Sequence, residues 1–264
     1  MNKVTAPSFR ERKQDGDRIA MLTAYDYPTA KLLDECEVDA ILVGDSCAMA
    51  VMGRKDTLNL TMDEILHHVR MVAAATENAL VVADMPFMSY QISTEEAVRN
   101  AGRLIAEGGA GAVKLEGPAS IFGDAIAAII DIGIPVMGHL GLTPQSVNQL
   151  GGYKVQGKKP EHAERILDDA KGLDEIGCFG VVLECVPASL AKEVTASLDC
   201  PTIGIGAGQG CDGQILVMHD ILGWGFTKFT KTYVDVKGAM EKAFTDYVQD
   251  VKAGVFPAAE HAYK

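Results

Sequence analysis

The sequence predicts an α/β protein folded as a single (β/α)8 barrel, the TIM-barrel architecture, and three observations lead to this prediction. Eight short apolar segments with β-strand character follow one another, most of them separated by helical patterns. The length of 264 residues is close to the roughly 250 residues of a bare barrel. Four of the segments end in a carboxylate, at Asp45, Asp84, Glu116 and Glu184. Such barrels assemble their active sites from strand tips at the carboxyl-terminal face.

The eight expected strands cover residues 19–25, 40–45, 80–84, 112–116, 135–139, 180–185, 202–205 and 215–218. Their apolar character is nearly continuous, which is typical of a parallel sheet buried on both faces. The last of them has the least regular pattern. Eight such units in a chain of this length favour a closed barrel over an open, doubly wound sheet.

Helices are expected between the strands. Thr61 and Glu64 have the spacing of a capping box, so a helix should begin there. Thr94 is a candidate N-cap for a helix over residues 94–105, which starts with acidic residues. Apolar residues recur at helical spacing over 161–176, and Gly177 should end that helix.

The domain organisation is expected to be simple. We find no internal repeat, low-complexity segment or linker, so residues 1–264 are interpreted as one barrel domain. Residues 1–18 should form a helix or arm outside the barrel. A final helix is expected near residues 236–251, followed by a short tail.

Composition narrows the class of protein. The formal net charge is −12 and no dense basic block is present, so we expect neither nucleic acid nor an anionic membrane as a partner. No apolar run reaches about 18 residues, and the first residues lack the apolar core of a secretory signal. The six cysteines have no metal-type spacing. These features predict a cytoplasmic enzyme with reduced cysteines.

The carboxylates of the second and third strands suggest a metal. Adjacent strands lie about 4.8 Å apart, so Asp45 and Asp84 would converge on one cation. Oxygen ligands without His or Cys suit Mg²⁺. Glu116, on the fourth strand, would be a third ligand or hold a metal-bound water. The alternative is that Asp45 and Asp84 cap the helices that follow them.

Alternation along the fourth strand places Lys114 and Glu116 on the same face. A lysine within an apolar run is costly unless it is paired. Lys114 should therefore meet a carboxylate or bind an anion in the barrel mouth. The alternative is a structural Lys–Glu pair that closes the top of the barrel.

Three further features have two interpretations each. His139 ends the fifth strand and either hydrogen-bonds a substrate or is structural. The glycine-rich run at 204–210 follows the seventh strand and either approaches an anion or forms a tight turn. Residues 151–159 form a glycine-rich, basic loop that is either a mobile lid or a solvated connection.

Several long motifs resemble the ketopantoate hydroxymethyltransferase (3-methyl-2-oxobutanoate hydroxymethyltransferase) family. They lie at residues 23–26, 43–46, 140–148, 151–157, 183–187, 203–208 and 212–220. The similarity runs from about residue 8 to the C-terminus. The resemblance implies a TIM barrel, Mg²⁺ and a place in pantothenate biosynthesis. It also implies transfer of a one-carbon unit from 5,10-methylenetetrahydrofolate to 3-methyl-2-oxobutanoate, and assembly as a homodecamer.

The resemblance also implies roles for individual residues. Asp45 and Asp84 would bind the metal, with Glu116 close to it. The oxoacid would contact Asp45, Ser46, Asp84 and Lys114. Glu184 would be the proton acceptor. His139 and Tyr25, the latter within one of the motifs, are further candidates for the site.

The expected chemistry is coherent. A 2-oxoacid chelates Mg²⁺, and the ion stabilises the enolate that forms when Glu184 removes the C3 proton. The enolate then attacks the one-carbon unit of the folate. One alternative is a C–C lyase or phosphonomutase on a related barrel, which would be expected to carry a nucleophilic Cys or Ser in a lid loop. The other is a non-catalytic binding protein, against which the presence of all five charged residues argues.

Overall fold

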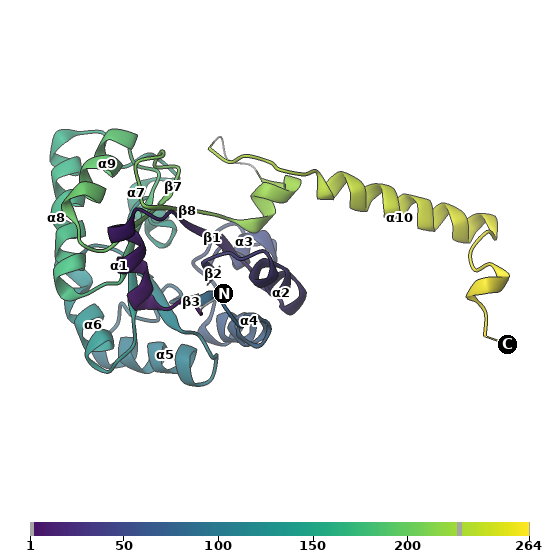
Figure 1. Cartoon of the computed structure of the whole chain (residues 1–264), viewed down its shortest axis with the longest axis horizontal. Helices are drawn as coiled ribbons and strands as arrows, with labels where there is room; N and C mark the ends of the chain where they lie inside the picture. The colour runs from purple at the N-terminus through teal and green to yellow at the C-terminus, as the bar shows by residue number, and fades with distance from the viewer. Residues whose placement is uncertain (1–2, 226–228, 264) are drawn as a thin grey trace. The chain divides into compact units, whose positions relative to one another are not determined.

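The computed structural model describes residues 3–225 and 229–263, and its eight strands form one closed parallel barrel (Figure 1). Each strand pairs with its neighbours in sequence, and β8 pairs with β1. The strands are β1 (Ile19–Thr23), β2 (Ala40–Val43), β3 (Leu80–Asp84), β4 (Ala112–Glu116), β5 (Val136–Gly141), β6 (Gly180–Glu184), β7 (Thr202–Ile205) and β8 (Gly213–Leu216). The predicted (β/α)8 barrel is confirmed.

The strand boundaries match the expected ones at β3, β4 and β7 and differ by one or two residues at the other five strands. Strand β8 begins at Gly213, two residues before the expected start, because its register is set by pairing with Ile19 of β1 and Ile203 of β7. A Cβ at Gly213 would lie 2.5 Å from the Ile19 carbonyl oxygen, so this close approach requires glycine. Hydropathy alone favours the apolar residues further along and misses the start of the strand.

The principal helices are α1 (Ala6–Asp15), α2 (Tyr27–Glu35), α3 (Cys47–Ala50), α4 (Met62–Ala75), α5 (Thr94–Ala106), α6 (Ala119–Asp131), α7 (Val147–Leu150), α8 (Pro160–Ile176), α9 (Ala188–Ser197) and α10 (Val236–Ala253). Short helices η1 (Pro144–Ser146), η2 (Asp220–Trp224) and η3 (Ala259–His261) complete the set. In the described chain β7 runs into β8 without an intervening helix.

Two of the three expected helix signals are confirmed. Thr61 and Glu64 form the capping box of α4. Helix α8 ends at Gly177, which is in the left-handed conformation. The N-cap of α5 was wrong by one residue, because the Ser93 side chain rather than Thr94 accepts the hydrogen bond from the Glu96 backbone N–H.

The apolar core has two layers. Outward-facing strand residues such as Ile41 and Val113 pack against the helices. Inward-facing residues such as Met21, Val82 and Met137 fill the barrel. Helix α1 joins the inner layer and closes the amino end of the barrel.

Phe9 of α1 is fully buried, and its ring packs edge-on against Phe179 at 5.3 Å between centroids. Three ion pairs hold the same helix, one of them between Arg12 and Asp39 at 2.8 Å. Arg10 lies 2.9 Å from Asp174 and Lys13 lies 3.2 Å from Asp212. The amino end of the barrel is therefore closed by apolar packing with polar contacts at its rim.

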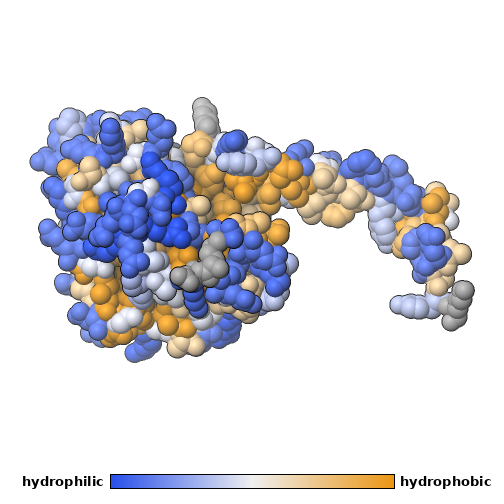
Figure 2. Space-filling view, in the orientation of Figure 1, coloured by the Kyte–Doolittle hydropathy of each residue, from blue (hydrophilic) through white to orange (hydrophobic). Residues whose placement is uncertain are grey.

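The chain divides into two compact units, Met1–Val217 and Met218–Lys264. The barrel is the first unit. The second contains η2, α10 and η3, and no described residue of α10 is buried. The space-filling view shows apolar residues gathered on this unit (Figure 2). The expectation that residues 1–264 form one domain remains a prediction. No described helix is both long and apolar enough to cross a membrane.

Candidate active site

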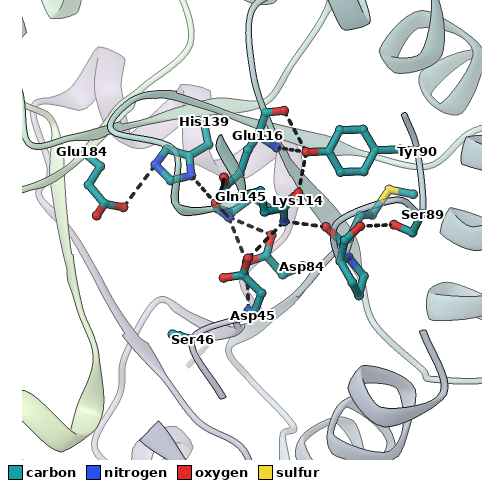
Figure 3. Close-up of polar contacts among 12 residues, drawn as sticks. Asp45, Ser46, Asp84, Ser89, Tyr90, Lys114, Glu116, His139, Gln145 and Glu184 are labelled. Carbon is teal, nitrogen blue, oxygen red and sulfur yellow. Dashed lines mark hydrogen bonds and ion pairs between the residues drawn. The ribbon is translucent and has the colours of Figure 1, made fainter. Parts of the chain in front are cut away.

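Ionisable side chains occupy the inward positions at the carboxyl ends of four successive strands (Figure 3). They are Asp84 of β3, Lys114 and Glu116 of β4, His139 of β5 and Glu184 of β6. The register places Asp84 beside Lys114, and Glu116 beside His139. Because side chains alternate along a strand, all five face the barrel mouth.

Lys114 and Asp84 form a buried ion pair. The Lys114 Nζ lies 2.7 Å and 2.9 Å from the two Asp84 carboxylate oxygens, and both side chains are almost fully buried. Glu116 Oε1 is further from this Nζ, at 3.8 Å. Burial alone would lower the pKa of Lys114, but Asp84, Glu116 and Asp45 raise it, so the ammonium stays charged. The partner of Lys114 is thus chiefly Asp84 rather than Glu116.

Asp45 comes from a turn rather than from the strand itself. Strand β2 ends at Val43, and the Asp45 backbone N–H donates to Asp84 Oδ2 at 3.1 Å. Burial and the neighbouring Asp84 and Glu116 raise the pKa of Asp45 well above its usual value. Burial also raises the pKa of Asp84, against the effect of Lys114.

The alternative role for these two aspartates, as helix caps, is not supported. Helix α3 has Ser46 at its N-cap position and α5 has Ser93 there. The Asp84 side chain instead contacts the Lys114 ammonium and the Asp45 backbone N–H, and the Asp45 side chain accepts from Gln145 Nε2 (Figure 3). Their position in the barrel mouth is therefore available for binding.

His139 lies between two glutamates (Figure 3). Its Nδ1 is 3.4 Å from Glu116 Oε1 and its Nε2 is 3.3 Å from Glu184 Oε2. Burial and Lys114 lower the pKa of His139, but Glu116 and Glu184 outweigh them and raise it to about 9. An imidazolium here links Glu184, whose side chain is 17% exposed at the rim, to the buried Glu116.

Ser46 is held by Tyr25. The Tyr25 hydroxyl and Ser46 Oγ are 2.8 Å apart, and Tyr25 is buried under the turn that carries Asp45. Burial raises the pKa of the Tyr25 phenol, so the group is neutral and hydrogen-bonding. The structure thus places Ser46 next to Asp45, whereas Tyr25 lies behind it.

Sequence reasoning missed Gln145 and Tyr90. Gln145 Nε2 donates to Asp45 Oδ2 at 3.0 Å, and the Tyr90 hydroxyl lies 2.8 Å from Gln145 Oε1. Both side chains are buried. Gln145 belongs to the motif at 140–148, but a neutral side chain in the three-residue helix η1 gives no periodicity signal that would mark it as part of the site.

The carboxylates of the barrel mouth are of the type that binds a divalent cation. Among residues 3–225 and 229–263, however, no three His, Cys, Asp or Glu side chains are already arranged as a metal site. Three buried carboxylates, Asp45, Asp84 and Glu116, face one lysine. Glu116 Oε1 is buried and accepts no hydrogen bond in the described structure. Burial and neighbouring carboxylates raise the pKa values of Asp45 and Asp84, so a further positive charge beside them would stabilise their ionised forms.

The two glycine-rich loops lie at the same end of the barrel. In the loop after β7, Gly206 and Gly208 have positive φ, and Gln214 donates to the Gly208 carbonyl at 2.9 Å. A tight turn accounts for these features. In the 151–159 loop, the Gln156 backbone N–H donates to the Cys185 carbonyl, directly after Glu184. Its role as a lid stays a prediction.

Comparison with known proteins gives concordant results. The family model described as ketopantoate hydroxymethyltransferase matches residues 3–259. The 3-methyl-2-oxobutanoate hydroxymethyltransferase of Clostridium novyi (strain NT) is 53% identical over 99% of this chain and 96% of its own length. That of Syntrophus aciditrophicus (strain SB) is 54% identical over 99% of this chain and 97% of its own.

Solved structures share the fold at low sequence identity. A phosphonopyruvate hydrolase superposes with a TM-score of 0.64 at 13% identity, covering 99% of this chain and 92% of its own. A 2,3-dimethylmalate lyase superposes with a TM-score of 0.60 at 16% identity, covering 98% of this chain and 91% of its own. At these identities the likeness extends to the fold alone.

Proposed function

Since this chain belongs to the ketopantoate hydroxymethyltransferase family and is an enzyme of that type, we propose that its full reaction uses a folate. A hydroxymethyl group passes from 5,10-methylenetetrahydrofolate to 3-methyl-2-oxobutanoate, giving 2-dehydropantoate. The reaction is the first committed step of pantothenate biosynthesis. The family assignment removes the support for a lyase, a phosphonomutase or a passive binding protein.

One observation carries the proposal. A cationic group and a carboxylate base stand at opposite ends of a single row of ionisable side chains, from the Asp84–Lys114 pair to Glu184. His139 separates the two ends. A 2-oxoacid needs both groups, because its carboxylate and keto oxygens are negative while its C3 proton must leave.

The oxoacid is bound at the Lys114 end. Lys114 attracts the substrate carboxylate, and its charge is secured by Asp84 at 2.7 Å. Asp45 and Ser46 border the same space from the turn after β2. Hydrogen bonds to charged groups contribute about 1.5–3 kcal/mol each, so this end supplies much of the oxoacid affinity.

Asp45 and Asp84 would hold Mg²⁺, with Glu116 close to it. The support is the surplus of buried carboxylates and the Glu116 Oε1 atom that accepts no hydrogen bond in the described residues. Oxygen-only ligands are those that Mg²⁺ prefers. When bound, the ion supplies Lewis acidity to the keto and carboxylate oxygens of the substrate, which makes its C3 proton more acidic.

Glu184 accepts the C3 proton. Its Oε2 lies 3.3 Å from His139 Nε2, so the imidazole fixes the carboxylate at the barrel mouth. The C–H bond breaks, the proton goes to Glu184, and the electron pair forms the new C–C bond to the methylene carbon of the folate. The two C–N bonds of that carbon break, water supplies the hydroxyl group, and the folate nitrogens keep the electron pairs and take up protons, so that tetrahydrofolate leaves. A positioned base of this kind contributes about 10²–10⁴-fold in rate.

The first half-reaction tests the role of Glu184 without folate. With Mg²⁺ in D2O, the wild-type enzyme should wash deuterium into C3 of 3-methyl-2-oxobutanoate, as followed by NMR. Glu184→Gln keeps the shape of the side chain but cannot take the proton. It should bind the oxoacid while exchanging about 10²–10⁴-fold more slowly.

A matched control and two outcomes complete the experiment. Glu193→Gln, an exposed residue of α9, should exchange at the wild-type rate. Undiminished exchange in Glu184→Gln would move the base to His139. Absence of exchange in the wild type, despite oxoacid binding, would contradict a folate-independent first step.

We further propose that the protein is a cytoplasmic homo-oligomer, a decamer by family resemblance. The support for self-association is α10, which carries exposed Met240, Phe244, Tyr247 and Val251 at helical spacing along one face. Contiguous exposed apolar surface marks interaction sites. Light scattering coupled to gel filtration measures the molecular mass, and a monomer at micromolar concentration would contradict the assembly.

A further inference from the structure

Gln145 contacts two of the proposed site's carboxylates at once. Its Nε2 donates to Asp45 Oδ2 at 3.0 Å, and its backbone N–H donates to Glu116 Oε2 at 2.9 Å. Asp45 follows β2 and Glu116 ends β4, and these strands are not neighbours in the barrel. No backbone hydrogen bond between β2 and β4 fixes the distance between the two carboxylates directly. Gln145 contacts both of them and so can help to fix that distance.

The orientation of the Gln145 amide follows from its partners. The second Nε2 hydrogen points to the Met85 carbonyl at 3.0 Å, while Oε1 accepts from the hydroxyl of Tyr90 and from Gln91 Nε2 at 3.2 Å. A flipped amide would place Oε1 against two oxygen acceptors, Asp45 Oδ2 and the Met85 carbonyl, which offer it no hydrogen. The side chain is also only 5% exposed, so water does not replace these bonds.

Tyr90 ties this amide to strand β4. Its hydroxyl lies 2.8 Å from Gln145 Oε1 and 2.9 Å from the Glu116 carbonyl, and it accepts from the Glu116 backbone N–H at 3.2 Å. Tyr90 is 2% exposed. The hydroxyl therefore fixes Gln145 relative to the backbone that carries Glu116.

We propose that Gln145 is a positioning residue that sets the relative geometry of Asp45 and Glu116 for the divalent cation, with Tyr90 holding its amide. This rests on the proposed function, in which those carboxylates surround Mg²⁺. Hydrogen bonds to ligating carboxylates orient them, and losing such a partner typically costs 10–100-fold in metal affinity or activity. Gln145 acts through the carboxylates, without contact with the reacting carbon.

The test uses calorimetry with Mg²⁺ as the titrant, alone and in the presence of 3-methyl-2-oxobutanoate. Gln145→Met keeps the volume and the backbone N–H but loses the amide. Its Mg²⁺ dissociation constant should rise about 10–100-fold. Tyr90→Phe keeps Gln145 and loses only the hydroxyl, so its dissociation constant should rise in the same direction by a smaller factor. Gln149→Met, an exposed glutamine on α7, should equal the wild type.

The thermal unfolding temperature in EDTA separates positioning from stability. A residue that only supports the fold would lower this temperature and leave the Mg²⁺ affinity of the folded protein unchanged, which would overturn the proposal. If Gln145→Met does not fold, Tyr90→Phe decides, and a wild-type Mg²⁺ affinity in that variant would overturn it.

Failure of the proposal and failure of the proposed function are distinguishable. If the wild type binds Mg²⁺ and exchanges the C3 proton, and the variants bind Mg²⁺ equally well, only the role of Gln145 is contradicted. A wild type that binds no Mg²⁺ with or without the oxoacid overturns both.

Discussion

The two ends of the barrel interior are built from the same eight strands and have opposite chemistry. At the amino end, Phe9 and Phe179 close an apolar interior in which Met21 and Met137 are almost fully buried. At the carboxyl end the inward positions carry carboxylates, a lysine and a histidine.

The same sheet therefore places residues that stabilise the fold at its amino end and residues that can bind or react at its carboxyl end. Apolar burial at the amino end contributes roughly 25 cal/mol per Å² removed from water. At the carboxyl end, burial and neighbouring carboxylates raise the pKa values of Asp45 and Asp84, which opposes folding at neutral pH. Substitutions at the amino end should therefore change chiefly the free energy of unfolding, and substitutions at the carboxyl end should change chiefly binding and activity.

The largest effect is expected at the carboxyl end, on activity. Asp84→Ala removes a proposed metal ligand and should abolish both Mg²⁺ binding and transfer, while circular dichroism shows a folded barrel. EDTA should abolish wild-type activity and Mg²⁺ should restore it. Asp63→Ala, whose side chain is 84% exposed, serves as the control. Full activity in metal-stripped enzyme would contradict the role of the metal.

The amino end should give a large effect on stability instead. Phe9→Ala leaves a cavity in the closed interior and should lower the free energy of unfolding by about 3–5 kcal/mol, as measured in urea. The turnover number of the folded enzyme should stay within about twofold of wild type. Leu32→Ala, at an exposed position on α2, should be near neutral. Loss of turnover in folded Phe9→Ala would break the separation of the two ends.

Lys114→Ala should change oxoacid binding by an intermediate amount. The variant loses the charge that faces the substrate carboxylate, so calorimetry should show oxoacid affinity weaker by about 1.5–3 kcal/mol. The exposed Lys31→Ala provides the matched control. An unchanged affinity in Lys114→Ala would assign Lys114 to the structural role of neutralising Asp84.

At the carboxyl end of the barrel, the direction of a side chain could be predicted from the sequence wherever it follows from alternation along a strand. Lys114 and Glu116 are two residues apart on one strand, and Asp84 and Glu184 end apolar runs, so their shared direction follows from the two-residue period. Asp45 was expected on a strand but lies in the turn after it, where hydropathy gives no boundary.

Other features depend on contacts between segments far apart in the chain. Gln145 and Tyr90 are defined by each other and by Glu116, across loops that follow two different strands. Likewise, no periodicity in residues 1–18 indicates that Phe9 meets Phe179 at the amino end of the barrel. Such contacts are set by tertiary packing, so local propensity and spacing do not reveal them.

The two ends of the barrel should also differ in how their contributions to stability depend on pH. Glu116 and Glu184 raise the pKa of His139 from 6.5 to about 9, so the folded state holds this proton more tightly than the unfolded state. The resulting stabilisation is complete below pH 6.5 and is lost as pH rises to about 9. In EDTA, wild-type stability should fall by on the order of 3 kcal/mol over this range.

His139→Gln and Phe9→Ala should then change the pH dependence of the free energy of unfolding in different ways. His139→Gln removes the titrating group, so its free energy of unfolding should vary less with pH than that of the wild type between 6.5 and 9. Phe9→Ala removes only apolar contact, so its curve should lie below the wild-type curve and run parallel to it. Urea unfolding at several pH values measures both. If His139→Gln retained the full wild-type slope, the titration would belong to other groups of the carboxyl end, with Asp45 and Asp84 next, because their raised pKa values also make stability increase as pH falls.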